Sequence, residues 1–207
     1  GSVINRNRFA RLLSPKSIAV FGSTGADYAI TESRKFGFEG DIWAVHPKRE
    51  ELAGLPCYRK VADLPGVPDA AYVAVNAEAA IEIVRDLAAA GCGGAVLYAS
   101  GFSEVGGDGV ERQQRLVEAA GDMPIIGPNC YGVLNCIDRA VLWPDQHGCS
   151  AQESGVAVIT QSGNIGLNMT MQQRGLPLAF MFTMGNQAAV SIADVMDALL
   201  DDDRITA

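Results

Sequence analysis

Short apolar runs alternate with longer amphipathic segments along most of the chain. The runs have the length and continuity of strands buried on both faces of a sheet, at residues 18–21, 41–45, 70–75, 94–98 and 124–127. The segments between them have the period and composition of helices, at residues 28–36, 77–90 and 109–120. Strands that alternate with helices predict a parallel sheet joined by right-handed crossovers. We therefore expect an α/β fold, with a Rossmann-like domain over residues 3–142.

The same kind of pattern starts again after residue 154. Residues 143–154 contain proline, glycine and polar side chains and are typical of a linker. Beyond the linker the sequence predicts two strands and two helices, at residues 155–160, 178–183, 165–174 and 190–200. Two strands cannot form a parallel sheet that is covered on both faces. Residues 155–207 are therefore expected to be the N-terminal part of an incomplete second α/β domain.

The first predicted strand runs directly into the turn Gly22-Ser23-Thr24-Gly25, and a helix follows. A strand, a glycine turn and a helix N-terminus together leave backbone N–H groups pointing outward, where they can hold a phosphate. An ordinary connection between a strand and a helix has the same composition, because glycine and serine are common there. From this stretch alone both interpretations stay open.

The charge balance narrows the class of partner. The formal net charge is −8, so no basic surplus exists to neutralise a nucleic-acid backbone. No apolar run approaches the ~20 residues that a membrane span needs, and no signal peptide precedes the first strand. We expect neither nucleic acid nor a membrane as a partner, and a cytoplasmic location.

The cysteines favour a reduced protein without a metal. They are odd in number, scattered and free of any Cys-x-x-Cys pair: Cys57, Cys92, Cys130, Cys136 and Cys149. His147 and Cys149 form the one close pair of these residue types, and two ligands in one loop make a weak zinc site. No metal site is therefore predicted.

The residues after the second strand argue against NAD as the ligand. The glycine turn lacks the Gly-x-Gly-x-x-Gly spacing, and an NAD site also needs an acidic residue at the end of that strand for the ribose hydroxyls. This chain has His46-Pro47-Lys48 there instead. A lysine suits a ligand with an extra phosphate, such as NADP or the 3′-phosphate of coenzyme A (CoA). A solvated surface lysine is the plainer alternative for Lys48.

Six motifs then occur in a fixed order: VFGSTG at 20–25, AVHPK at 44–48, VAVN at 73–76, SGFSE at 100–104, GPNCYG at 127–132 and QSG at 161–163. The series resembles the NDP-forming acyl-CoA synthetases, the superfamily that includes ADP-forming acetate–CoA ligases and the succinyl-CoA synthetase α subunit. The resemblance spans almost the whole chain. It implies a CoA-binding Rossmann-like domain followed by the start of a flavodoxin-like domain.

The resemblance also implies a role for individual residues along the carboxyl ends of the strands. The expected CoA-binding residues are Gly22, Ser23, Thr24 and Gly25 at the phosphates, Lys48 near the adenosine, Val75 and Asn76 in the nucleotide cleft, Tyr98, Ala99 and Ser100 beside the pantetheine, and Asn129 and Cys130 towards the thiol. Cys130 is expected to be buried, because the CoA thiol itself supplies the nucleophile. A second phosphate site is expected at Ser162, Gly163 and Asn164, for which a simple helix N-cap is the alternative.

In this family a carboxylic acid, CoA and a nucleoside triphosphate give acyl-CoA, nucleoside diphosphate and phosphate, through an acyl phosphate and a phosphorylated histidine. Neither His46 nor His147 matches that histidine, which is expected beyond Ala207. No catalytic residue is therefore assigned, and the chain alone is expected to bind CoA without turnover. The resemblance implies ATP and Mg²⁺ in the intact enzyme, an ATP-grasp domain or β subunit as partner, a small carboxylic acid as substrate, and a homo- or hetero-oligomer.

Two other functions stay open. One is a non-catalytic CoA-binding protein, against which the renewed pattern after residue 154 counts. The other is an NAD(P)-binding Rossmann protein, which the missing acidic residue after the second strand disfavours. One departure from the family is visible: the segment between Gly25 and Gly37 is shorter than usual by more than a helical turn.

Overall fold

The computed structural model describes residues 8–161 and 177–206 of the 207-residue chain. Its first part is a seven-stranded sheet with the strand order β3-β4-β2-β1-β5-β6-β7. The strands are β1 (Ser17–Gly22), β2 (Asp41–Val45), β3 (Glu51–Leu52), β4 (Leu55–Tyr58), β5 (Ala70–Ala74), β6 (Ala95–Leu97) and β7 (Ile125–Ile126). All neighbours pair in parallel except β3 and β4, which are antiparallel. The mostly parallel α/β fold predicted from the sequence is confirmed.

The helices of this part are α2 (Ala10–Leu13), α3 (Thr24–Phe36), α4 (Ala77–Ala90) and α5 (Asp108–Ala120), with the 3-10 turns η1 (Val61–Asp63) and η2 (Ser103–Val105). Helices α3, α4 and α5 lie close to the positions predicted from the sequence. Helices α3 and α4 end at Gly37 and Gly91, which adopt the left-handed conformation that a C-terminal glycine provides without a steric penalty. Helix α3 begins at Thr24, earlier than predicted. The glycine turn between β1 and α3 is therefore shorter than the sequence indicated.

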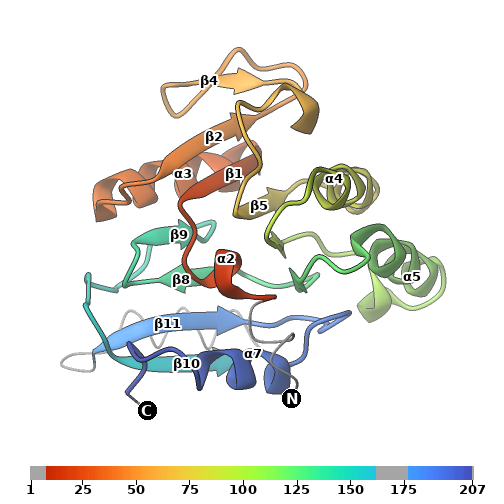
Figure 1. Cartoon of the computed structure of the whole chain (residues 1–207). Coiled ribbons are helices and arrows are strands. Elements are labelled where there is room, and N and C mark those ends of the chain that lie inside the picture. Colours follow the sequence, from red (N-terminus) through yellow and green to blue (C-terminus); the bar gives the residue numbers. More distant parts are fainter. Residues whose placement is uncertain (1–7, 162–176, 207) are drawn as a thin grey trace.

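Successive residues of β1 face opposite sides of the sheet, and both sides are buried. Ala19 and Phe21 pack with α4 and α5, whereas Ile18 and Val20 pack with α3 and with the second sheet. Figure 1 shows α4 and α5 side by side at the right and the second sheet in the lower part of the view, below β1. This double burial explains why the strand is a continuous apolar run rather than an alternating one.

The second sheet has four strands in the order β10-β11-β8-β9. They are β8 (Val133–Asn135), β9 (Ala140–Leu142), β10 (Val156–Thr160) and β11 (Leu178–Thr183), and helix α7 (Ile192–Leu199) follows. Strands β10 and β11 pair in parallel, as a renewed βαβ pattern requires, while β8 pairs antiparallel with both β11 and β9. The hairpin β8–β9 was not predicted, because strands of three residues are too short to show a period.

The two sheets share one hydrophobic core. Phe180 and Phe182 of β11 stack with ring centroids 5.6 Å apart and belong to the same buried cluster as Ile18, Val20 and Tyr72 of the first sheet. The division into residues 3–142, 143–154 and 155–207 stays a prediction; β8 and β9 fall within the first of these ranges and pair with the second sheet. Within the described ranges, no helix has the length and apolar character needed to cross a membrane.

Register brings the ends of the central strands to one edge. Phe21 lies opposite Val45, and Gly22 lies opposite Ala74. The residues that follow β1, β2 and β5 therefore meet at the carboxyl edge of the sheet, which is where open α/β sheets bind ligands.

Candidate functional site

A cavity of about 830 Å³ lies at this carboxyl edge. It crosses the ends of five adjacent strands, β4, β2, β1, β5 and β6. At ~4.8 Å between neighbouring strands, such a site extends over roughly 19 Å. Its volume lies within the range of small-molecule and cofactor pockets. The cavity can therefore hold one long ligand laid across the sheet.

The turn after β1 forms the centre of the cavity wall. Gly22 has φ +133°, and a Cβ atom there would lie 2.4 Å from the carbonyl oxygen of Ala74. The absence of a side chain lets β1 and β5 approach each other and leaves a hollow for a ligand. Ser23 is exposed and also lines the cavity. The first N–H groups of α3 begin here, so the turn can hold a phosphate.

Thr24 and Gly25, which the sequence analysis placed at the phosphates, lie in the first turn of α3 and outside the cavity lining. A Cβ atom at Gly25 would lie 3.4 Å from the Ala74 Cβ and 3.5 Å from the Pro144 Cβ. At Gly25 the N-terminus of the helix is thus packed against Ala74 and Pro144. A ligand phosphate can reach Gly22 and Ser23 more directly than Thr24 and Gly25.

Basic side chains gather at the end of the cavity next to β2 and β4. His46, Arg59 and Lys60 line it there. Arg59 is held by its own donors: Nη1 donates to the carbonyl oxygens of His46 at 3.2 Å and Arg49 at 2.7 Å, and Nη2 donates to Glu50 at 2.6 Å. Lys60 is exposed, and within the described residues no carboxylate forms an ion pair with it.

His46 is fixed in one neutral form. Its Nδ1 accepts the backbone N–H groups of Lys48 at 3.0 Å and Arg49 at 2.9 Å, so the proton of the neutral ring lies on Nε2. Partial burial, together with the positive charges of Arg49, Arg59 and Lys48, lowers the pKa of His46. His46 therefore offers a neutral N–H donor next to two cations.

Lys48, the residue that the sequence indicated for the adenosine end, is exposed and does not line the cavity. Arg59 and Lys60 take the corresponding place, which is not predicted from the sequence. The signal in the sequence is a basic pair directly after residues 55–58, which form β4. Only the parallel pairing of β4 with β2 reveals that this pair reaches the same edge.

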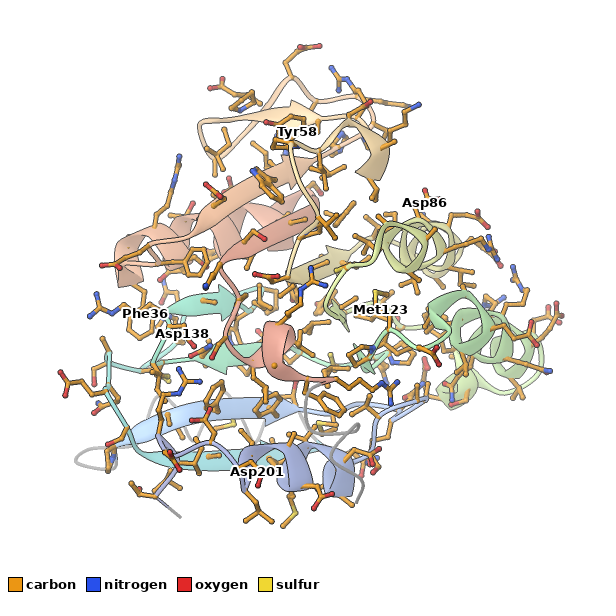
Figure 2. The ribbon with its side chains drawn as sticks, in the orientation of Figure 1. Phe36, Tyr58, Asp86, Met123, Asp138 and Asp201 are labelled. Atoms are coloured by element: carbon orange, nitrogen blue, oxygen red, sulfur yellow. The ribbon has the colours of Figure 1, made fainter. Side chains whose placement is uncertain are left out.

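Helix α4 forms one wall of the cavity. Asn76 lines the cavity and caps this helix, with its Oδ1 accepting the N–H of Ala79 at 2.9 Å. Val75 also lines the cavity, as do the exposed carboxylates Glu82 and Asp86 of α4. Asp86 is labelled on α4 in Figure 2. The carboxylates keep this wall unfavourable for phosphate, so the phosphates of a ligand are directed to the opposite, basic side.

The far end of the cavity is aromatic and uncharged. Tyr98, Ala99 and Ser100 line it, and the Tyr98 side chain is 44% exposed. Tyr98 meets Tyr131 edge to face at 6.3 Å between centroids, and Tyr131 meets Trp143 in the same way at 4.7 Å. Tyr131 donates its hydroxyl to Asp145 at 3.0 Å, and burial together with this carboxylate raises the pKa of Tyr131 to about 12.

Asn129 and Cys130, expected at the thiol end, lie next to this region but outside the cavity lining. The Asn129 backbone N–H donates to the Ala99 carbonyl oxygen at 2.8 Å, and its side chain reaches Asn186 at 3.4 Å. Cys130 is buried, and its thiol donates to the Leu97 carbonyl oxygen at 3.2 Å. Burial raises the pKa of Cys130 to about 12. This environment suits a structural thiol and not a nucleophile.

Cys130 is accordingly expected to resist alkylation. At pH 8 a thiol with a pKa of about 12 is ionised in roughly one molecule in 10⁴. Iodoacetamide should therefore modify the partly exposed Cys57 and Cys149 well before Cys130, as followed by peptide mass spectrometry. Guanidinium-unfolded protein, in which all five cysteines react, is the control. Early alkylation of Cys130 in the folded chain would contradict this assignment.

The remaining residues singled out from the sequence lie elsewhere. Ser162, Gly163 and Asn164 fall outside the described residues. His147 packs against Phe36, away from the cavity. In the ranges that the structure covers, no group of three or more His, Cys, Asp or Glu side chains could hold a metal ion.

Fold and site together define an α/β protein with a long cavity, basic at one end, across the carboxyl edge of a mostly parallel sheet. Residues 16–135 match the family model described as a CoA binding domain, and residues 153–207 match a succinyl-CoA ligase like flavodoxin domain. The chain belongs to the CoA-binding domain family. The resemblance predicted from the ordered motifs is confirmed.

Three relatives illustrate the similarity. The chain is 37% identical over 205 residues to a trans-feruloyl-CoA synthase from an unknown prokaryotic organism, covering 93% of this chain and 29% of the relative. It is 30% identical over 201 residues to an ADP-forming acetate–CoA ligase of Methanocaldococcus jannaschii, covering 91% of this chain and 27% of the relative. Among solved structures, acetyl-coenzyme A synthetase 1 of Ca. Korarchaeum cryptofilum, in complex with phosphate and ADP, matches with a TM-score of 0.86 and 29% identity, covering 96% and 44%. The chain thus spans less than half the length of these relatives.

Proposed function

We propose that this chain is the CoA-binding part of an acid–CoA ligase of the ADP-forming type. The observation that carries the proposal is the cavity. It has basic groups at one end, the turn at Gly22 and Ser23 in the middle, where Gly22 has no side chain, and an uncharged aromatic end. CoA has the matching order of parts, with phosphates on its nucleotide and an uncharged pantetheine chain leading to the thiol. The names of the relatives support the ligase activity.

The chemistry of the donors gives CoA one orientation. Arg59, Lys60 and the His46 Nε2–H bind the 3′-phosphate and the adenosine end. Gly22 and Ser23 receive the diphosphate at the start of α3. Val75, Asn76, Ala99 and Ser100 then flank the pantetheine, which ends beside Tyr98 and the Asn129 backbone.

In this proposal the chain supplies only the cofactor site. ATP, Mg²⁺ and the carboxylic acid bind to parts of the protein outside this chain, which are either fused to it or belong to a partner subunit. Two relatives are named as α subunits, which supports a partner subunit as one arrangement. The chain alone is accordingly expected to bind CoA and to form no acyl-CoA from acid and ATP.

Calorimetric titration with three ligands tests the proposal. We expect CoA to bind, 3′-dephospho-CoA to bind at least tenfold more weakly because it lacks the phosphate that the basic end holds, and NADH to give no heat. Circular dichroism of the same sample verifies that the chain is folded. Tighter binding of NADH than of CoA would assign the cavity to a nicotinamide nucleotide. A folded chain that binds none of the three would remove the cofactor role.

A further inference from the structure

Two cysteines outside the cavity come together in the structure although they are separated in the sequence. Cys136 directly follows β8, and Cys149 lies in the connection between β9 and β10. Cys136 is fully buried, Cys149 is partly exposed, and both belong to one small apolar cluster with Trp143. The two side chains pack in this cluster closely enough for each thiol to influence the other.

The connection that carries Cys149 is folded back onto the protein. The backbone N–H of Gln152 donates to the Cys136 carbonyl oxygen at 3.0 Å, which holds the segment after Cys149 against the end of β8. The Cys149 N–H donates to His147 Nδ1 at 3.3 Å. Because these bonds lie on both sides of Cys149, they fix its position next to Cys136.

His147 anchors the same connection to α3. Its side chain is only 5% exposed, its ring meets Phe36 edge to face at 5.1 Å, and its Nε2 lies 3.8 Å from Glu32 Oε2. Figure 2 shows Phe36 at the end of α3, beside the β8–β9 hairpin. The two cysteines therefore lie where the connection, the hairpin and α3 meet.

The direction of its pKa shift distinguishes Cys149 from the other thiols. Interaction with the Cys136 thiol, with the help of His147, lowers the pKa of Cys149 against the opposing effect of burial. Burial instead raises the pKa values of Cys57, Cys92 and Cys130. Cys149 is therefore the partly exposed thiol whose ionisation is favoured, whereas the pKa of the buried Cys136 beside it is raised.

We propose that Cys149 and Cys136 form a redox-active thiol pair, in which Cys149 is oxidised by a hydroperoxide and Cys136 then closes a disulfide with it. This proposal goes beyond the CoA site and stands independently of it. An accessible thiolate next to a second thiol is the arrangement of a sensing and a resolving cysteine.

The chemistry balances with hydrogen peroxide as the only co-reactant. The Cys149 sulfur attacks one peroxide oxygen, the O–O bond breaks, and a sulfenic acid forms while the other oxygen leaves, with a proton from solvent, as water. The Cys136 sulfur then attacks the Cys149 sulfur, the S–S bond forms and the S–O bond breaks. The hydroxyl leaves as water with the Cys136 proton. Two thiols lose two electrons, and the peroxide gains them.

The test oxidises the folded chain with a small excess of hydrogen peroxide at pH 7 and measures the products by mass spectrometry without reduction. We expect a loss of two hydrogen masses and a cross-link between the tryptic peptides on either side of Arg139. Fragment ions must distinguish Cys136 from Cys130, which lies on the same peptide. The rate should fall as the pH is lowered, because protonation of Cys149 removes the nucleophilic thiolate.

Three variants make the result specific. Cys149→Ser should slow oxidation at least tenfold, and Cys136→Ser should stop at a sulfenic acid on Cys149 that dimedone traps. Cys57→Ser is the matched control, because Cys57 is also partly exposed but its pKa is raised, so this variant should behave like the unmodified chain. Oxidation that begins at Cys57, or a Cys149 sulfenic acid that persists while Cys136 is present, would overturn the proposal.

Discussion

Alanine in place of Gly22 is expected to lower the free energy of unfolding by about 3–4 kcal/mol. Gly22 has φ +133°, which side-chain-bearing residues rarely adopt, and its Cβ would lie 2.4 Å from the Ala74 carbonyl oxygen. Backbone strain and a steric overlap therefore act at the same position. Relief of the overlap requires β5 to move away from β1, which also distorts the centre of the cavity. Urea unfolding monitored by circular dichroism measures the loss.

Gly91→Ala is the matched control for this substitution. Gly91 also has a positive φ, +85°, but nothing lies within 4 Å of its Cβ position. Its replacement should therefore cost only the conformational strain, about 1 kcal/mol. CoA binding should be weakened by the change at Gly22 and unaffected by the change at Gly91, which is far from the cavity. Equal losses of stability would show that the close approach of Ala74 contributes nothing.

Lys60→Ala is expected to weaken CoA binding about tenfold, because a lysine–phosphate contact contributes about 1.4 kcal/mol. Lys60 lines the basic end of the cavity, and among the described residues it has no ion-pair partner to keep it from a ligand. The affinity for 3′-dephospho-CoA should change by less than about twofold, since that ligand lacks the phosphate. The difference between the two ligands, measured by calorimetry, is therefore the specific readout.

Lys48→Ala provides the comparison within the same region. Lys48 is exposed and lies outside the cavity lining, so we expect its removal to cost about twofold in affinity through long-range charge alone. A high-salt titration should abolish this small effect and leave most of the Lys60 effect. If Lys48→Ala costs more than Lys60→Ala, the adenosine end lies at the residue that the sequence indicated, and our placement of the phosphate is wrong.

Strand and helix positions in the first sheet were predictable for a physical reason. Strands β1 and β5 are buried on both faces, so their apolar runs are continuous, and α4 shows a clear helical period with Asn76 and Gly91 at its ends. Residues that directly follow these strands, such as Gly22, Val75 and Asn76, could therefore be placed at the carboxyl edge. They do line the cavity.

Other features depend on contacts between segments that are distant in the sequence. Arg59 and Lys60 follow the short strand β4, and only the pairing of β4 with β2 carries them to the cavity. Strands β8 and β9 have three residues each and gain their stability from β11. The exclusion of Gly25 from the cavity follows from its packing against Ala74 and Pro144.

Periodicity and ordered motifs are local properties that need no partner, so the sequence alone predicts the fold class, the order of the longer strands and helices, and the family. The tertiary structure alone decided which charged groups face the cavity and which two of the five cysteines meet. Those outcomes depend on strand register and on the path of the connection after β9. Both are set by burial and hydrogen bonds between distant segments, and no local pattern encodes them.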